Sequence, residues 1–215
     1  MTNQATGNLG PFYQFFETYG SERLNGLNES HFTGLTTAEK EEAWNYLKDR
    51  FESSDERISG MYKLDPSRAL VLFKEALKKP IESSPYAASR EAIEECRIML
   101  LRFVYSIEPD KQYVDAMTVF AHSEFENVRF LFAKAAPIYQ VTPEVVAALK
   151  GMIFTETEQL PLSAAISKYM VIHGMDFNAR DPLYKSIYMS LRSDDPKTKM
   201  AAMRRLEESY APDYT

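Results

Sequence analysis

The chain contains few of the residues from which disulfide scaffolds and phosphate-binding loops are built. Its 215 residues include one cysteine, three histidines and eight glycines. A single cysteine excludes an intramolecular disulfide, and no glycine-rich phosphate-binding motif is present. No apolar run approaches the roughly 18 residues that span a bilayer. These shortages argue against a disulfide-stabilised domain, a P-loop or dinucleotide-binding enzyme, and a membrane-spanning protein.

The few reactive side chains are poorly placed for chemistry. Cys96 lies in an apolar-periodic segment, which predicts a small buried residue rather than a catalytic thiol. His31, His122 and His173 are far apart in the sequence, and none has a partner at metal-ligand spacing. His122 and His173 fall at predicted helix ends, where an imidazolium favours the helix dipole, whereas no role is predicted for His31. We therefore expect no cofactor, no metal site and no enzymatic activity.

The charge of the chain is moderately acidic and unevenly distributed. Its formal net charge is -6, which argues against a general nucleic-acid binder and against a polybasic membrane-surface protein. Residues 1–60 contain ten acidic and five basic side chains, whereas the rest of the chain is nearly balanced. The polar stretch 1–10 lacks the pattern of a signal peptide, so we expect a cytoplasmic protein.

Prolines mark the predicted beginnings of helices. Proline suits the first helical turn, where its missing N–H group would be unpaired in any case. A serine, threonine or aspartate, the residues that cap helix N-termini, directly precedes five of the six prolines at such positions. Apolar residues then recur at helical spacing, and no segment alternates like a strand. The six prolines are Pro66, Pro85, Pro143, Pro161, Pro182 and Pro196.

These signals predict an all-α fold in a single domain, 1–215, made of about ten short helices packed antiparallel to their neighbours in sequence. Such helices form either a stacked α-solenoid or an irregular helical bundle. The stretch 20–35, rich in glycine, asparagine and serine, is left unassigned. The expected helices are 11–19, 37–52, 55–63, 66–78, 85–106, 111–121, 124–135, 143–154, 161–173, 182–192 and 196–210.

Three segments resemble the second helix of HEAT-like repeats. In each, an acidic or proline-containing turn precedes small, apolar and arginine residues, over 64–70, 126–130 and 194–206. The resemblance covers about a third of the chain. It implies a curved surface that binds another macromolecule.

Some HEAT-like proteins are DNA glycosylases, so the resemblance also implies an alternative enzymatic function. Such enzymes have a basic cleft lined with aromatic residues and carboxylates, which the acidic balance of this chain does not favour. The basic candidates for DNA binding lie in the predicted C-terminal helix. They are Lys197, Lys199, Arg204 and Arg205.

The predicted helix 37–52 has an acidic side. On a helical wheel its apolar residues, Trp44 among them, form one arc of about 100°. Tyr46 falls among the acidic residues of the opposite arc, and further carboxylates follow in the next predicted helix. An aromatic side chain among carboxylates is typical of a binding hot spot for a basic protein, although a solvated helix face is the alternative. The candidate partner-binding residues are Glu39, Glu42, Tyr46, Asp49, Glu52, Asp55 and Glu56.

The aromatic residues of segment 12–16 leave a second question open. Four of these five residues are aromatic, so one helix cannot bury all of them on a single face. Either other helices of the chain surround them, or part of the segment contacts a partner.

The sequence therefore favours a non-enzymatic protein-binding protein with a basic protein partner. Within that class, its size and acidity resemble those of immunity proteins, which neutralise basic protein toxins by occlusion. A HEAT-like scaffold with several partners and a HEAT-like DNA glycosylase are the alternatives. We expect neither nucleic-acid nor membrane binding, and the sequence assigns neither the identity of the partner nor the oligomeric state.

Overall fold

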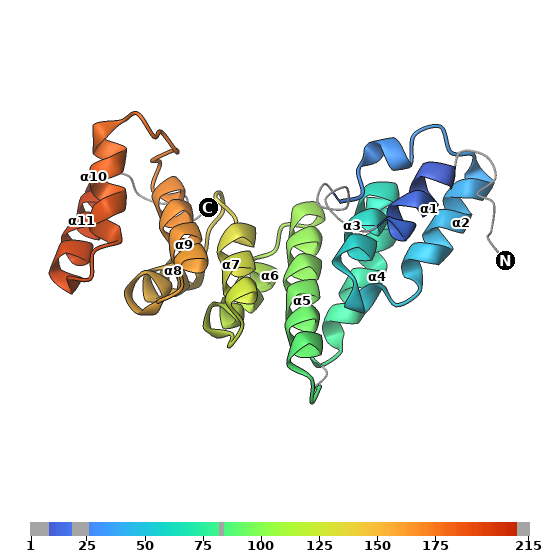
Figure 1. Cartoon of the computed structure of the whole chain (residues 1–215), viewed down its shortest axis with the longest axis horizontal. Helices are drawn as coiled ribbons and strands as arrows, with labels where there is room; N and C mark the ends of the chain where they lie inside the picture. The colour runs from blue at the N-terminus through green and yellow to red at the C-terminus, as the bar shows by residue number, and fades with distance from the viewer. Residues whose placement is uncertain (1–8, 19–25, 82–83, 210–215) are drawn as a thin grey trace. The chain divides into compact units, whose positions relative to one another are not determined.

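The computed structural model describes residues 9–18, 26–81 and 84–209 of the chain. Throughout these residues the secondary structure is helical and no strand is formed, which confirms the prediction of an all-α fold (Figure 1). The helices are α1 (Gly10–Glu17), α2 (Thr37–Lys48), α3 (Asp55–Leu64), α4 (Pro66–Lys78), α5 (Ala87–Ile107), α6 (Lys111–Met117), α7 (Glu126–Ala135), α8 (Pro143–Thr155), α9 (Gln159–Ile172), α10 (Pro182–Leu191) and α11 (Pro196–Ser209), with short 3-10 helices η3 (Glu29–His31), η4 (Phe51–Ser53) and η5 (Thr118–His122).

Four of the six prolines begin helices where the sequence predicts, whereas Pro85 lies two residues before α5 and Pro161 is the third residue of α9. Pro66 is the first residue of α4, and the Asp65 side chain accepts a hydrogen bond from the Arg68 backbone N–H. Thr142 caps α8 in the same way. These side chains satisfy backbone donors that have no partner inside the helix, so a local signal is enough to fix the start.

Two predicted helices end earlier than expected. The predicted helix 37–52 stops at Lys48, because Asp49 adopts an extended backbone and Arg50 a left-handed one with φ 54°. The predicted helix 111–121 is α-helical only to Met117 and then tightens into η5. As a consequence, Asp49 and Glu52 do not belong to the same helical face as the carboxylates of α2.

The chain divides into two compact units, Met1–Ile107 (unit 1) and Glu108–Thr215 (unit 2). Each unit has its own set of fully buried large side chains. In unit 1 they include Trp44, Ile58 and Phe73, and in unit 2 Phe132 and Tyr169. The single domain expected from the sequence stays a prediction.

In unit 1, helices that are two apart in the sequence run parallel. Asp55, at the start of α3, feels the charge of Glu95 in the middle of α5. The ring of Tyr62, near the end of α3, stacks on Phe103 near the end of α5, with 4.3 Å between ring centroids. Helices α3 and α5 therefore run in the same direction, and α4, which lies between them in the sequence, runs in the opposite direction.

Two ion pairs show that the segment formed by α2 and η4 also runs parallel to α4. Near the N-terminal ends, Arg68 Nη1 lies 2.6 Å from Glu41 Oε1. Beyond the C-terminal ends, Lys79 Nζ lies 2.5 Å from Glu52 Oε1. Each pair joins residues 27 positions apart, so these two segments also run parallel.

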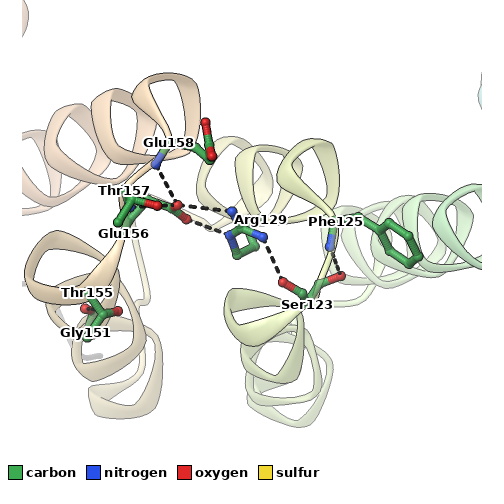
Figure 2. A network of polar contacts seen from close by, with 8 residues as sticks. All are labelled: Ser123, Phe125, Arg129, Gly151, Thr155, Glu156, Thr157 and Glu158. Atoms are coloured by element: carbon green, nitrogen blue, oxygen red, sulfur yellow. Dashed lines mark hydrogen bonds and ion pairs between the residues drawn. The ribbon is translucent and has the colours of Figure 1, made fainter. Parts of the chain in front are cut away.

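In unit 2, α7 and α9 pack along each other and run parallel (Figure 1). Near their N-terminal ends, Arg129 Nε donates a 2.6 Å hydrogen bond to Glu156 Oε2, and this pair is partly buried. Glu156 Oε1 also accepts from the backbone N–H groups of Thr157 and Glu158, as Figure 2 shows. At the C-terminal end of α7, Lys168 Nζ donates to the carbonyl group of Ala136 over 2.5 Å.

Parallel helices joined by an antiparallel helix are the arrangement from which α-solenoids are stacked. Both units contain this arrangement, α3–α4–α5 in unit 1 and α7–α8–α9 in unit 2. The HEAT-like resemblance itself stays a prediction.

Candidate protein-binding surface

Helix α2 carries two of the predicted acidic residues, Glu39 and Glu42, and a capping box fixes its N-terminus. The Thr36 side chain accepts a hydrogen bond from the Glu39 backbone N–H, and Glu39 Oε2 accepts one of 2.8 Å from the Thr36 backbone N–H. This reciprocal capping box orients the first turn of the helix. Because the Glu39 carboxylate takes part in this capping box, Glu39 fixes the start of α2 and contributes only indirectly to a protein-binding surface.

Tyr46 lies between α2 and the aromatic residues of α1. Its ring is half-buried and makes edge or tilted contacts with Phe12, Tyr13 and Phe16 at centroid distances of 4.9–5.6 Å. The Arg57 guanidinium lies 4.6 Å from the centroid of the Tyr46 ring. Arg57 also donates hydrogen bonds to the carbonyl groups of Tyr46 and Asp49 at the C-terminal end of α2. Tyr46 is therefore a packing residue, and its role in partner binding stays a prediction.

The aromatic segment of α1 is enclosed to a large extent by unit 1 itself. Phe12 and Phe15 are buried, whereas Tyr13 and Phe16 are half-buried against Tyr46. Of the two alternatives left open by the sequence, the described residues favour surrounding helices over a partner.

Glu42 is exposed on α2 and is fixed by a residue of α1. The Tyr13 hydroxyl donates a 2.8 Å hydrogen bond to Glu42 Oε1. Burial of the phenol, together with this bond and the Glu42 charge, raises the pKa of Tyr13 to about 12. Tyr13 therefore keeps its proton at neutral pH, and the Glu42 carboxylate faces solvent from a defined position.

Asp49 and Glu52 lie beyond the end of α2. The Asp49 side chain is exposed, while its carbonyl group accepts a hydrogen bond from Arg57. Glu52 is exposed and forms the ion pair with Lys79 described above. The prediction that both lie on the acidic face of one helix with Glu42 is wrong, because the backbone turns at Asp49 and Arg50.

Asp55, Glu56 and Glu95 gather where α3 packs against α5, and we call them the α3–α5 acidic cluster. Desolvation, a hydrogen bond with Glu56 and the charges of Glu56 and Glu95 raise the pKa of Asp55 to about 6, although its side chain remains partly exposed. Desolvation and the Glu91 charge also raise the pKa of Glu95. The side-chain charges that act on Asp55 are negative, so a cation is favoured there.

The cysteine and the histidines occupy structural positions. Cys96 is buried, which confirms the prediction of a small buried residue, and burial with the nearby charges of Asp55 and Glu95 raises the pKa of its thiol to about 12. His173 is the buried C-terminal cap of α9, and His122 ends η5. His31 closes a capping box with Asn28, accepting its backbone N–H at Nδ1 over 3.1 Å.

The basic residues of α11 are only in part accessible. Lys197, Arg204 and Arg205 are exposed. Lys199 is buried and donates a 2.5 Å hydrogen bond to the Ile153 carbonyl group of α8. Of the four basic candidates for DNA binding, Lys199 therefore joins α11 to α8 and is not accessible.

Comparisons of the chain with family models, with curated proteins and with solved structures find no match. Within residues 9–18, 26–81 and 84–209, no three metal-ligating side chains are grouped so that they could hold an ion. None of the helices in this part of the chain has the length and apolar character needed to cross a bilayer.

Proposed function

We propose that this chain is a non-enzymatic protein-binding protein that engages a basic protein partner through the acidic surface of unit 1, as an inhibitor of the immunity type does. The observation that carries the proposal is the exposure of carboxylates on three consecutive elements, α2, η4 and α3. Among the predicted residues, the exposed ones are Glu42, Asp49, Glu52 and Asp55.

The electrostatics of this region support a basic partner. Residues 37–56 contain seven carboxylates and three basic side chains. Partner lysine or arginine side chains would relieve the repulsion inside the α3–α5 acidic cluster and would speed encounter over several ångströms. Capping of α2 by Thr36 and of α3 by Ser54 fixes the backbone of both helices, so little backbone entropy is lost there on binding.

The alternatives receive different support. The parallel helices of each unit suit a HEAT-like scaffold with several partners, since stacked helices offer extended surfaces. A DNA glycosylase is less favoured, because Lys199 is buried and the remaining basic groups of α11 form only a small exposed set.

The proposal is tested in two steps. Affinity capture from the native host should first yield one dominant, stoichiometric and basic protein. Association of that protein should then slow several-fold at low salt when Glu42→Lys and Asp49→Lys are combined, because charge mainly governs the association rate. The matched control reverses two exposed carboxylates of unit 2, Glu144→Lys and Glu208→Lys.

Either of two results would contradict the proposal. Equal association rates for the two double variants would remove the acidic surface from binding. Capture of many weak partners would favour the scaffold instead.

A further inference from the structure

A groove of about 340 Å³ follows the contact between α7 and α9 in unit 2. Short side chains of α9 and larger apolar side chains line it together. Leu160 is 58% exposed and Ile138 36% exposed, which leaves apolar surface open to solvent at the groove. The lining residues are Phe130, Lys134, Ile138, Leu160, Ser163, Ala164, Ser167, Lys168 and Val171.

The charged residues of the groove are all basic. Lys134 is exposed on α7, and Lys168 is half-buried on α9, where its Nζ donates to carbonyl groups at the end of α7. Arg192 approaches the other part of the groove, with its Nη1 3.4 Å from Ser163 Oγ. Among the residues that the structure describes, no carboxylate lines the groove, although the chain as a whole has a net charge of -6.

The dimensions suit a helical partner. From Leu160 to Val171 the groove follows α9 for eleven residues, which corresponds to about 16 Å or three helical turns. A helix lying in it would place apolar residues at i, i+4 and i+7 against its apolar lining. Acidic residues flanking that apolar face would meet Lys134 and Lys168.

We infer that the α7–α9 groove binds an acidic amphipathic helix of a partner protein. This surface is separate from the acidic surface of unit 1 and takes a partner of opposite charge, so its test is independent of the proposed function. A chain with both surfaces would bind a basic protein with one unit and an acidic helix with the other.

The test uses the full chain and two synthetic, fluorescein-labelled helical peptides of about four turns. Both peptides carry leucine on one face, and the flanking positions are glutamate in one and lysine in the other. Fluorescence anisotropy should show tighter binding of the glutamate peptide. Lys134→Glu should weaken that binding about five-fold, as expected for reversal of a surface charge pair, and should shift the preference toward the lysine peptide.

Two controls separate the groove from the rest of unit 2. Lys185→Glu makes the same charge change at an exposed site on α10 that does not line the groove, and should leave the affinity unchanged. Leu160→Gln should weaken both peptides, whereas Met189→Gln, at a side chain that is 64% exposed on α10, should weaken neither. Circular dichroism checks that each variant is folded.

Several results would overturn the inference. One is equal affinity for the two peptides, and another is the same affinity in the Lys134→Glu and Lys185→Glu variants. Sedimentation velocity provides a third. If the chain is a dimer that Leu160→Gln converts to a monomer, the groove is occupied by a second copy and not by a partner helix.

Discussion

Asp55 carries a negative charge that the surrounding fold disfavours. Its pKa of about 6 lies above the value near 3.9 that an unfolded chain provides, so the folded state holds the proton more tightly. Because of this linkage, ionisation of Asp55 lowers the free energy of unfolding as the pH rises above the pKa in the unfolded chain. The full loss is reached above the pKa in the folded chain.

Asp55→Asn should therefore stabilise the chain at pH 7.5. We expect a gain of about 1 kcal/mol or less, because the side chain is partly exposed and solvent screens its neighbours. The gain should shrink as the pH falls through 6 toward 4, where the wild-type carboxyl group is increasingly protonated. Urea unfolding at several pH values measures it, and a gain that does not depend on pH would contradict this assignment.

The sequence predicts the individual residues of the acidic surface, but it does not predict which side chains contact them. Glu39, Glu42 and Asp55 follow from the local sequence as polar positions near helix starts or on a polar arc. Tyr13 reaches Glu42 across 29 positions, and Glu95 reaches Asp55 across 40. Contacts at such separations depend on how the helices pack, for which a single sequence gives no local signal.

Helix α3 approaches α2 closely at Gly60. A Cβ atom at this position would lie 2.8 Å from Leu27 Cδ1 and 2.9 Å from Leu47 Cδ2, and both leucines are fully buried. Alanine would gain about 1 kcal/mol of helix propensity, but crowding in a packed core costs about 1–3 kcal/mol. Gly60→Ala should therefore destabilise the chain, by about 1 kcal/mol.

Gly151 provides the matched control for that substitution. It lies inside α8, and a Cβ atom there would meet no heavy atom within 4 Å outside its own helix and its chain neighbours. Gly151→Ala should stabilise by up to about 1 kcal/mol, since only the propensity changes. Chemical denaturation of both variants gives the comparison, and the same sign for both would contradict the close approach at Gly60.

The partly buried pair of Arg129 and Glu156 stabilises the junction of α7 with α9. Replacing Arg129 by methionine would leave a carboxylate that is 5% exposed without its cation. We expect a loss of about 3 kcal/mol in the free energy of unfolding. The Arg129→Met, Glu156→Gln double variant should lose less than the sum of the single variants, and additivity would argue against direct coupling.

The same pair predicts a loss of stability in acid. Burial works to raise the pKa of Glu156, but the Arg129 hydrogen bond and charge, together with the backbone N–H groups of Glu158 and Thr157, outweigh it and hold the pKa below its usual value. A depressed carboxyl pKa contributes stability that is present above the unfolded value, about 4.3, and is lost as the pH falls through the folded one. The destabilising effect of Glu156→Gln should accordingly shrink below about pH 4 in acid titrations of unfolding.

Helix starts were more predictable than helix ends. Pro143 and Pro182 begin helices where expected, because proline and its preceding cap act through bonds within one turn. The end of α2 depends instead on Arg57, which donates to the Tyr46 and Asp49 carbonyl groups from the next helix. Contacts with a neighbouring helix set such an end, and the periodicity of residues 37–52 does not indicate these contacts.

The two units provide a test of cooperativity in the whole chain. Arg129→Met perturbs unit 2 and Gly60→Ala perturbs unit 1, each away from the division at Ile107 and Glu108. If the units unfold separately, each variant should raise amide hydrogen exchange only in its own unit. Increased exchange throughout the chain in both variants would instead show a single cooperative domain.

Three ion pairs of the chain share one spacing, since Glu41–Arg68, Glu52–Lys79 and Arg129–Glu156 are each 27 positions apart. Adding one residue inside α8 would turn everything beyond it by about 100° and displace it by about 1.5 Å, carrying Glu156 away from Arg129. Insertions and deletions are thus tolerated least within these intervals. A change of length is better accommodated in connections such as 173–181, which lies outside these intervals and between α9 and α10.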